Sequence, residues 1–573
     1  MLRSAETNGL NPRRQAWLTL LLAIGIMGAL AVVNHYYFLR IDLTADKRYT
    51  LTDSTRYMLQ NLDDVVFVRV FLEGSFPGGF RRLATATREM LDEMKVYAGR
   101  RLQYEFINPL KDKNEREIQE TVKALGEKGL QPANVQMRRG DEYSQQLVIP
   151  GALVYYKGRE AAVNLLISPR GMPTDQSLLL SLSRLEHQFG KAIRQLSFPI
   201  RPRLAFLTGH QEVEEFFLVD LLDEVSAFYD YDFFDLRSRA FIPQRYKVAI
   251  IVKPRSSFDE KDKFKLDQYL MNGGRILWML DALTADVDSV VRKSSFLATD
   301  LPLNLEDQLF RYGVRLNPNL VLDLQCAAVP LIVAQQNNQP RFARYPCFYF
   351  PVSTPKGTHP IVQRIDAVRL RFASSLDTLN LPQVNTTVLL HSSTRSRLVF
   401  TPWLVDFSTL RQRPDVHRFN RGDQIFAVLL EGTFPSLFRN RLTASFEAVL
   451  RDSLQQPFKP HSVSTAMIVI ADGDIGLNEF DSRGFPLELG YDRFNNRYFD
   501  NKDFLINCID YLAGYRTLLD TRNKTIQLRL LDSTKLKTER TWWQLFNVGG
   551  PLAMLLTGGT LFILLRRYLH TRR

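Results

Sequence analysis

Cysteine is scarce in this 573-residue chain, and the loop that binds nucleotide phosphates is missing. The three cysteines, Cys326, Cys347 and Cys508, are too few and too widely spaced for a disulfide framework or a zinc site. A single bond between Cys326 and Cys347 and three buried free thiols both remain compatible with the sequence. No G-x-x-x-x-G-K-[ST] segment occurs, so the phosphate cradle of nucleotide hydrolases is absent. We therefore expect that the chain does not hydrolyse ATP by itself.

The motifs of two further enzyme classes are also lacking. The sequence contains neither a G-x-S-x-G nucleophile elbow nor an H-E-x-x-H metal pair. Its eight histidines are spread from His35 to His570 and form no cluster. These absences predict a protein that is not an enzyme, with no catalytic residues, no bound metal and no cofactor.

A block of positive charge is missing from the body of the chain. The formal net charge is +13, but the tails outside residues 40–540 hold seven arginines and one glutamate. The remaining 67 basic and 60 acidic side chains give a mildly basic surface without the basic stripe typical of nucleic-acid binding. The excess charge at the tails indicates membrane topology, and we expect no nucleic-acid partner.

The chain does contain one long apolar run near each end, at residues 16–33 and 542–565. With its aromatic edge, each run reaches the roughly 20 residues needed to cross a bilayer. Arginines lie on the terminal side of both runs, which predicts cytoplasmic tails and a periplasmic body on the inner membrane. The alternative for the first run is a cleaved signal peptide, because Ala29-Leu30-Ala31 offers a small-x-small cleavage site.

These spans define the expected domain organisation. It comprises a cytoplasmic tail (1–15), a transmembrane helix (16–38), an N-terminal α/β extracytoplasmic domain (40–200), a second α/β domain (201–515), a membrane-proximal connector (516–541), a second transmembrane helix (542–565) and a basic cytoplasmic tail (566–573).

The N-terminal domain shows the element order β-α-β-α-β-β-α, which resembles a thioredoxin-like fold. Because residues 40–200 contain no cysteine, thiol redox chemistry is excluded there, and we expect a binding or spacer domain. The expected strands cover residues 65–72, 102–107, 134–137, 152–156 and 161–166; the expected helices cover 80–98 and 115–128, with a capped helix from Thr52 or Ser54 to Leu62 and a closing helix carrying Leu178 to Ile193.

The second domain begins with strands and helices in alternation, which predicts three or four parallel strands in a doubly wound sheet. This pattern resembles class I amidotransferase-like folds, yet the turn at residues 253–256 carries no nucleophilic cysteine. The expected strands cover 203–207, 231–236, 247–252, 275–280, 388–390, 424–430 and 466–471; the expected helices cover 213–228, 259–271 and 503–513, and residues 336–366 are expected to be irregular.

Polar residues follow several of these strands, where a doubly wound sheet places its ligand crevice. His210 and Glu212 lie two apart on one loop, and a metal or general-base role competes with a structural role in the turn. Asp472, Asp474 and Asn478 offer oxygen ligands to a cation, but the spacing is not that of an EF-hand, and a capped turn is the alternative. The candidate crevice for a ligand or partner comprises Thr208, His210, Glu212, Asp281, Asp472, Asp474 and Asn478.

A ten-residue segment of the N-terminal domain is similar in sequence to a segment of the second domain. Residues 72–81 and 430–439 agree at seven of ten positions, and both segments leave a strand through glycine and proline. Convergent turn chemistry explains this similarity more simply than a duplicated domain does.

Seven segments together resemble the GldG family, the gliding-motility-associated ABC transporter components of Bacteroidetes. They are Asp42-Leu-Thr-Ala-Asp-Lys-Arg-Tyr-Thr-Leu, Thr208-Gly-His-Gln-Glu, Leu270-Met-Asn-Gly-Gly-Arg, His359-Pro-Ile, Leu430-Glu-Gly-Thr-Phe, Ala471-Asp-Gly-Asp and Asn501-Lys-Asp-Phe-Leu-Ile-Asn. The resemblance covers essentially the whole chain. It implies a noncatalytic membrane subunit that works beside a GldF-like permease and a cytoplasmic GldA-like ATPase. It also implies that the second domain, residues 201–515, is of the auxiliary ABC-transport type.

Two other classes of function remain open at this point. An enzyme would need a reactive group at the crevice, with His210 or Glu212 as the candidates. An envelope scaffold, or a glycan- or protein-binding module without a transporter, would bind through the aromatic-rich residues 345–350.

Overall fold

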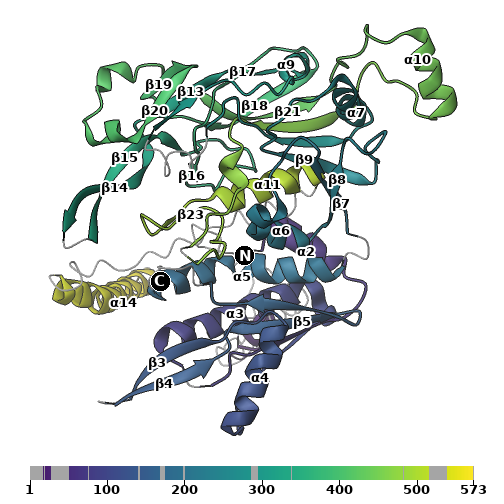
Figure 1. The fold of residues 1–573 in the computed structure, drawn as a ribbon. Coiled ribbons are helices and arrows are strands. Elements are labelled where there is room, and N and C mark those ends of the chain that lie inside the picture. The colour runs from purple at the N-terminus through teal and green to yellow at the C-terminus, as the bar shows by residue number, and fades with distance from the viewer. Residues whose placement is uncertain are drawn as a thin grey trace, which may run out of the picture. The chain divides into compact units, whose positions relative to one another are not determined.

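Mixed α/β structure fills most of the chain, as expected from the sequence (Figure 1). The computed structural model describes residues 17, 20–27, 51–74, 76–139, 142–167, 174–197, 201–285, 295–336, 339–481, 483–514 and 539–571. The chain divides into two units, Met1–Lys524 and Thr525–Arg573. The expected N-terminal tail and nearly all of the expected connector lie outside the described residues.

The N-terminal sheet has the strand order β2-β1-β5-β6. Strands β1 (Val66–Val70) and β2 (Leu102–Phe106) are parallel and are joined by helix α3 (Gly78–Ala98). The hairpin of β5 (Gly151–Tyr156) and β6 (Arg159–Asn164) runs antiparallel to β1. Alternate residues of β1 are buried, so this sheet presents one face to the N-terminal core.

Helices α2 (Asp53–Gln60) and α5 (Thr174–Ser197) contact α3, and the side chain of Thr52 caps α2. Helix α4 (Glu115–Glu127) lies where the sequence predicts a helix. One feature differs from the expected order. The strand predicted near residues 134–137 is β3 (Ala133–Arg139), and it pairs with an unforeseen β4 (Glu142–Val148) in a separate ribbon.

The second sheet has nine strands and the main order β12-β17-β21-β22-β10-β9-β7-β8. Five neighbouring strands are parallel, one more than the sequence predicts: β7 (Arg203–Thr208), β8 (Asp230–Asp235), β9 (Tyr246–Val252), β10 (Arg275–Met279) and β22 (Thr465–Ile470). The remaining strands of this sheet are antiparallel: β12 (Val314–Leu316), β17 (Leu376–Thr378), β18 (Val384–His391) and β21 (Ile425–Gly432).

Helices cover both faces of this sheet. Leu204 and Phe206 of β7 share a core with α6 (Val219–Ser226) and α11 (Asn501–Ala513). Ala205 and Leu207 share the opposite core with α7 (Glu260–Met271) and α9 (Glu306–Tyr312). Successive residues of a strand point to opposite faces, so the parallel half of the sheet is doubly wound.

The helix predicted over residues 213–228 is shorter in the structure. Glu214 is extended, with ψ of 154°, and the chain first forms the 3-10 turn η2 (Glu215–Leu218) before α6 begins. The periodic apolar residues of this segment therefore mark the buried face correctly but overstate the helix length.

The expectation of irregular structure over residues 336–366 is wrong for its first part. Strands β14 (Cys326–Gln336) and β15 (Gln339–Ser353) form a long hairpin. The prolines predicted a loop here, but β15 carries Pro340, Pro346 and Pro351 and still pairs with β14, and its end also pairs with β16 in a three-stranded sheet. Cys347 is buried in this region, and all three cysteines are free.

The hairpin packs within a further core, here called the insertion core, which is formed by residues inserted between β10 and β21 together with Phe499. This region also contains the paired strands β11 (Ser295–Ala298) with β20 (Trp403–Asp406) and β13 (Asn319–Asp323) with β19 (Ser396–Phe400). The remaining short elements are β16 (Val368–Arg369), α10 (Ala444–Ala448), β23 (Tyr491–Asp492), β24 (Arg497–Tyr498), the 3-10 turns η1 (Gly99–Arg101), η3 (Phe407–Arg411), η4 (Val416–Arg418) and η6 (Asp474–Gly476), and the π-turn η5 (Val449–Ser453).

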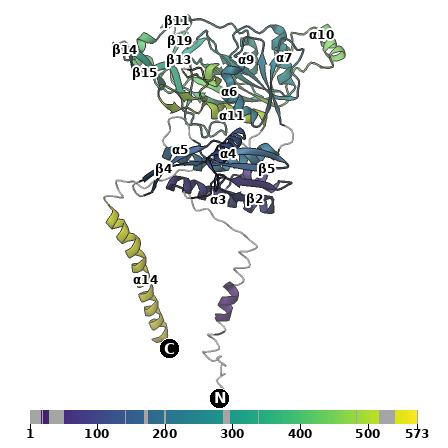
Figure 2. The ribbon, with the colours of Figure 1, turned by 60° about the horizontal axis from the view of Figure 1, so that its bottom comes forward.

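The second apolar run forms helix α14 (Arg540–Thr571), which Figure 2 shows as one continuous helix. Within it, Thr541–Tyr568 is long and apolar enough to cross a membrane, and it is the one such helix in the part of the chain that the structure describes. Of the first apolar run, residues 20–27 are helical with exposed apolar side chains. The rest of that predicted span lies outside the described residues, so the two-span layout stays a prediction.

Candidate functional site

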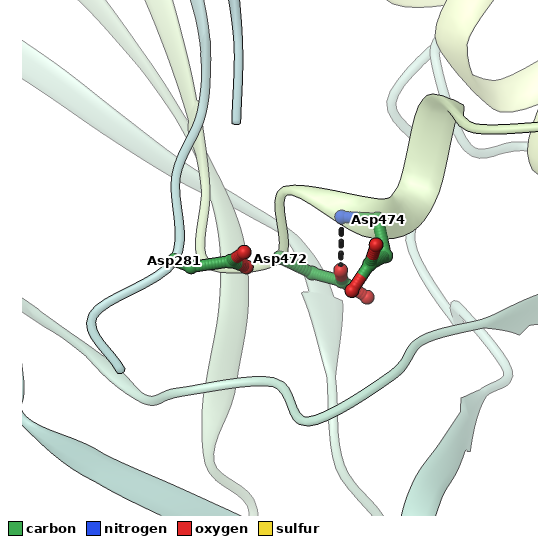
Figure 3. A group of neighbouring side chains, drawn as sticks. All are labelled: Asp281, Asp472 and Asp474. Carbon is green, nitrogen blue, oxygen red and sulfur yellow. Dashed lines mark hydrogen bonds between the residues drawn. The ribbon is translucent and has the colours of Figure 1, made fainter. Parts of the chain in front are cut away.

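Charged residues gather where three neighbouring parallel strands end. Lys253 follows β9, Asp281 lies just beyond β10, and Asp472 lies just beyond β22. Asp474 begins the turn η6 directly afterwards. Carboxylate oxygens of Asp281, Asp472 and Asp474 all lie within 4.8 Å of one another (Figure 3). The carboxyl edge of the sheet thus brings together three of the seven predicted crevice residues.

Backbone N–H groups fix two of these carboxylates. Asp281 Oδ1 accepts a hydrogen bond from Gly473 N at 2.6 Å, and Asp472 Oδ1 accepts one from Asp474 N at 2.7 Å. Asp472 Oδ2 accepts a third bond, from Arg371 N at 2.7 Å. A Cβ atom on Gly473 would approach Lys253 Cγ to 2.7 Å, so the close packing of the two loops requires glycine there.

Lys253 supplies the positive charge of this cluster. Its side chain is 4% exposed; Nζ lies 3.3 Å from Asp281 Oδ2 and also donates to Asp474 Oδ1. Burial disfavours the charged ammonium, but Asp281 and Asp474 outweigh that cost and raise the pKa of Lys253. Lysine nucleophiles require a lowered pKa, whereas the pKa of Lys253 is shifted upward, which favours the charged ammonium.

The strand-end position of Lys253 is also conformationally special. Its φ of +48° lies in the left-handed region that non-glycine residues rarely adopt, and such strain persists only where the surroundings impose it. This is the turn where the amidotransferase resemblance would place a nucleophile. The turn instead presents a buried ammonium that is engaged by two aspartates.

The pKa values of Asp281 and Asp472 are also raised, but for a carboxyl group this shift disfavours the charged form. Burial raises the pKa of Asp281 although Lys253 opposes the shift, and burial with the charge of Asp474 raises the pKa of Asp472 well above its usual value. Carboxylate oxygens are ligands that hard divalent cations prefer. Because the Lys253 ammonium already contacts two of the three carboxylates, the group has the character of a compensated ion cluster.

A second ion cluster adjoins the first through Arg371. The guanidinium groups of Arg369 and Arg371 both bond to Glu479, and Arg369 Nη1 lies 3.5 Å from Asp492 Oδ2. Burial opposes ionisation of Glu479, but Arg371 and Arg369 outweigh it and lower the pKa of Glu479. The sequence gives no indication of this cluster, because β16 and residues 479–492 carry no recognisable motif spacing.

The predicted residues Thr208, His210 and Glu212 lie at the end of β7. His210 is fully buried, stacks on Phe258 with a centroid distance of 3.7 Å, and places Nε2 3.1 Å from Asp262 Oδ2. Its backbone N donates to Glu212 Oε2 at 2.6 Å, and its carbonyl accepts from two backbone N–H groups of the loop after β9. This geometry favours the structural interpretation, because a covered imidazole cannot reach a substrate.

Asn478 lies apart from the aspartate cluster. Its Oδ1 accepts from Asp220 N at 3.2 Å, and its Nδ2 donates to the carbonyl of Leu487 at 2.8 Å. No hydrogen bond or ion pair among the described residues joins it to Asp281, Asp472 or Asp474. Asn478 therefore ties the start of α6 to the loop that follows η6.

Comparison with known proteins gives two family matches. Residues 201–508, more than half of the chain, match the family described as "ABC-type uncharacterized transport system". Residues 45–155 match a domain of unknown function. A solved structure titled "mmIFT52 N-terminal domain" is similar at 12% identity and a TM-score of 0.29, over 54% of this chain and 96% of that one. No curated protein matches the chain.

Proposed function

Because the chain belongs to the family described as an ABC-type uncharacterized transport system, we propose that it is a noncatalytic, membrane-anchored extracytoplasmic subunit of an ABC transporter. The family match over residues 201–508 carries this proposal. Helix α14 supports it by offering one anchor of sufficient length. The predicted first span would supply a second anchor and leave the body in the periplasm.

A noncatalytic subunit needs partners that supply energy and a path across the membrane. The sequence lacks a phosphate-binding loop, so nucleotide hydrolysis would belong to a separate cytoplasmic ATPase of the GldA type. A GldF-like integral permease would provide the path. We further propose, on the GldG resemblance alone, that this assembly serves gliding motility.

The described contacts suggest how partner motion could reach the body. Helix α5 makes two ion pairs with the second domain: Arg184 Nη2 lies 2.8 Å from Asp503 Oδ2, and Lys191 Nζ lies 2.6 Å from Glu224 Oε1. Both pairs are partly buried, so they hold the α/β domains in register more firmly than exposed pairs would. We propose that movement of transmembrane partner helices is transmitted across these contacts as a hinge between domains.

The scaffold alternative finds less support. Within residues 345–350, Cys347, Tyr349 and Phe350 are buried in the insertion core, so this stretch does not present a continuous aromatic surface for a glycan or a protein.

Affinity purification of the full chain from its native membrane in mild detergent tests the proposal. We expect an integral permease and a P-loop ATPase to co-purify in fixed ratio, and the purified chain alone to show no ATP turnover. A variant ending at residue 538, which lacks α14, is the matched control and should lose part of the assembly. Repeated recovery of the intact chain without either partner would contradict the transporter assignment.

A further inference from the structure

An arginine-lined pocket of about 600 Å³ lies away from the aspartate cluster. Helix α9 and strand β12 form one wall, and the segment after β21 forms the other. Its charged and polar lining comprises Glu306, Asp307, Arg311, Arg315, Arg439, Asn440 and Arg441, and its apolar lining comprises Phe310 and Leu437. A volume of this size is typical of small-molecule sites.

Local structure directs arginines from separate elements toward this pocket. Gly313, with φ of +105°, ends α9 in a left-handed conformation and turns the chain into β12, which places Arg311 and Arg315 on the same wall. On the other wall, Leu437 N donates to Asp267 Oδ1 at 2.9 Å. Asp267 is buried, so this bond fixes the segment that carries Arg439 before any ligand arrives.

The carboxylate of Asp307, which lines the pocket, is paired with two cations. Asp307 bonds to Lys263 Nζ at 2.7 Å and to Arg441 Nη1 at 3.0 Å. Burial opposes ionisation of Asp307, yet these two cations outweigh it and lower the pKa of that carboxyl. Asp307 thus holds Arg441 in place. The lining contains four arginines against the two carboxylates of Glu306 and Asp307, so positive charge is in excess there.

Three other arginines of the pocket are available to bind a ligand. Arg311, Arg315 and Arg439 are exposed and make no ion pair among the described residues. A guanidinium presents five donors in a planar fork that matches a carboxylate or a phosphate. Phe310, which is 54% exposed, adds an apolar surface at the same place.

We propose that this pocket binds a small organic anion whose phosphate or carboxylate group is held by Arg311, Arg315 and Arg439 and whose apolar part packs on Phe310. The inference does not depend on the transporter assignment, because it rests on the charge and shape of the pocket alone. The two acidic groups permitted by this chemistry differ in charge and geometry, so two probes separate them.

Calorimetric titration of the detergent-purified full chain with phenyl phosphate, benzoate and inorganic phosphate tests the proposal. We expect saturable binding of phenyl phosphate or benzoate, and the tighter of the two identifies the acidic group. The double variant R311Q/R439Q should weaken that binding about tenfold or more, since charge-assisted hydrogen bonds are lost. The matched control R239Q/R413Q removes two exposed arginines outside the pocket and should bind as the unaltered chain does.

Phe310→Ala tests the apolar part separately. It should bring phenyl phosphate down to the affinity of inorganic phosphate while leaving inorganic phosphate unchanged. Failure of both organic probes to bind, or equal weakening in the control variant, overturns the proposal. Because all the substituted residues are exposed, equal melting temperatures of the variants establish that folding is intact.

Discussion

The charge of Lys253 determines whether the aspartate cluster is stable. Replacement by methionine keeps the length of the side chain but leaves Asp281 and Asp474 without their buried cation. Removing one partner of a buried ion pair typically costs about 3–5 kcal/mol, so we expect a clear fall in the melting temperature of Lys253→Met at pH 8. The deficit should shrink at pH 5, because carboxyls with a raised pKa take up protons and relieve the repulsion.

Lys128→Met is the matched control for that experiment. Lys128 pairs with Glu160 at 2.7 Å, but both side chains are about 40% exposed, and exposed pairs contribute little to stability. Its melting temperature should stay close to that of the unaltered chain at both pH values. A pH-independent loss in Lys253→Met would mean that lost packing, and not charge, causes the effect.

Asp500 should make the protein less stable as the pH rises. Burial raises the pKa of Asp500 from 3.8 to about 6, so the folded state binds this proton more tightly than the unfolded state does. Stability therefore falls between about pH 4 and pH 6 as the folded carboxyl ionises. Asp500→Asn should remove that cost and stabilise the protein by about 1–3 kcal/mol at pH 7, with no gain at pH 4, in thermal unfolding.

The pKa of Asp63 is shifted in the opposite direction from that of Asp500, so Asp63 serves as the comparison. Hydrogen bonds from Lys157 and Tyr156 lower the pKa of Asp63 to about 2, so its contribution is present above pH 3.8 and is lost only as the pH falls toward 2. Asp63→Asn should therefore destabilise the chain equally at pH 5 and pH 7. If Asp500→Asn showed the same flat profile, the assigned ionisation of Asp500 would be wrong.

At the scale of secondary-structure elements, the two similar segments, residues 72–81 and 430–439, share a backbone conformation where each leaves its strand. Gly74 follows β1 with φ of +139°, and Gly432 ends β21 with φ of +144°. The aromatic residues two positions later, Phe76 and Phe434, are buried in separate cores. In both exits glycine permits the positive φ and the aromatic ring anchors the segment in its core.

Alanine substitutions should separate strain from steric conflict at these exits. A Cβ on Gly74 would meet only side-chain atoms at 3.7 Å or beyond, whereas a Cβ on Gly432 would lie 2.0 Å from the carbonyl oxygen of Gln383. Gly74→Ala should cost about 1–3 kcal/mol from its backbone conformation alone. Gly432→Ala should lower the melting temperature considerably more, because neighbouring backbone must move. Equal losses would mean that the approach of Gln383 relaxes freely.

Sequence patterns located these elements better than they located the contacts between them. Apolar runs such as 466–471 fixed the strands, and strand ends indicated that Asp281 and Asp472 would share an edge. Lys253 was missed as their cation because its sequence context is only a turn, and no sequence pattern indicates its burial or its positive φ. The β14–β15 hairpin was missed because proline weakens the strand signal wherever it occurs.

For the whole molecule, the number of membrane anchors is the decisive question, and α14 makes it testable. A chain ending at residue 538 lacks α14 but keeps the first apolar run. If that run stays as a second anchor, the shortened protein should remain in the membrane pellet after alkaline carbonate extraction, as the full chain does. If it is cleaved near Ala31 as a signal peptide, the shortened protein should appear in the soluble periplasmic fraction.

We expect retention, because the apolar run continues through Val32 and Val33 beyond the cleavage site. Removal of residues 1–38 in addition should abolish both membrane attachment and export, which distinguishes true anchoring from adhesion of the body to the lipid surface.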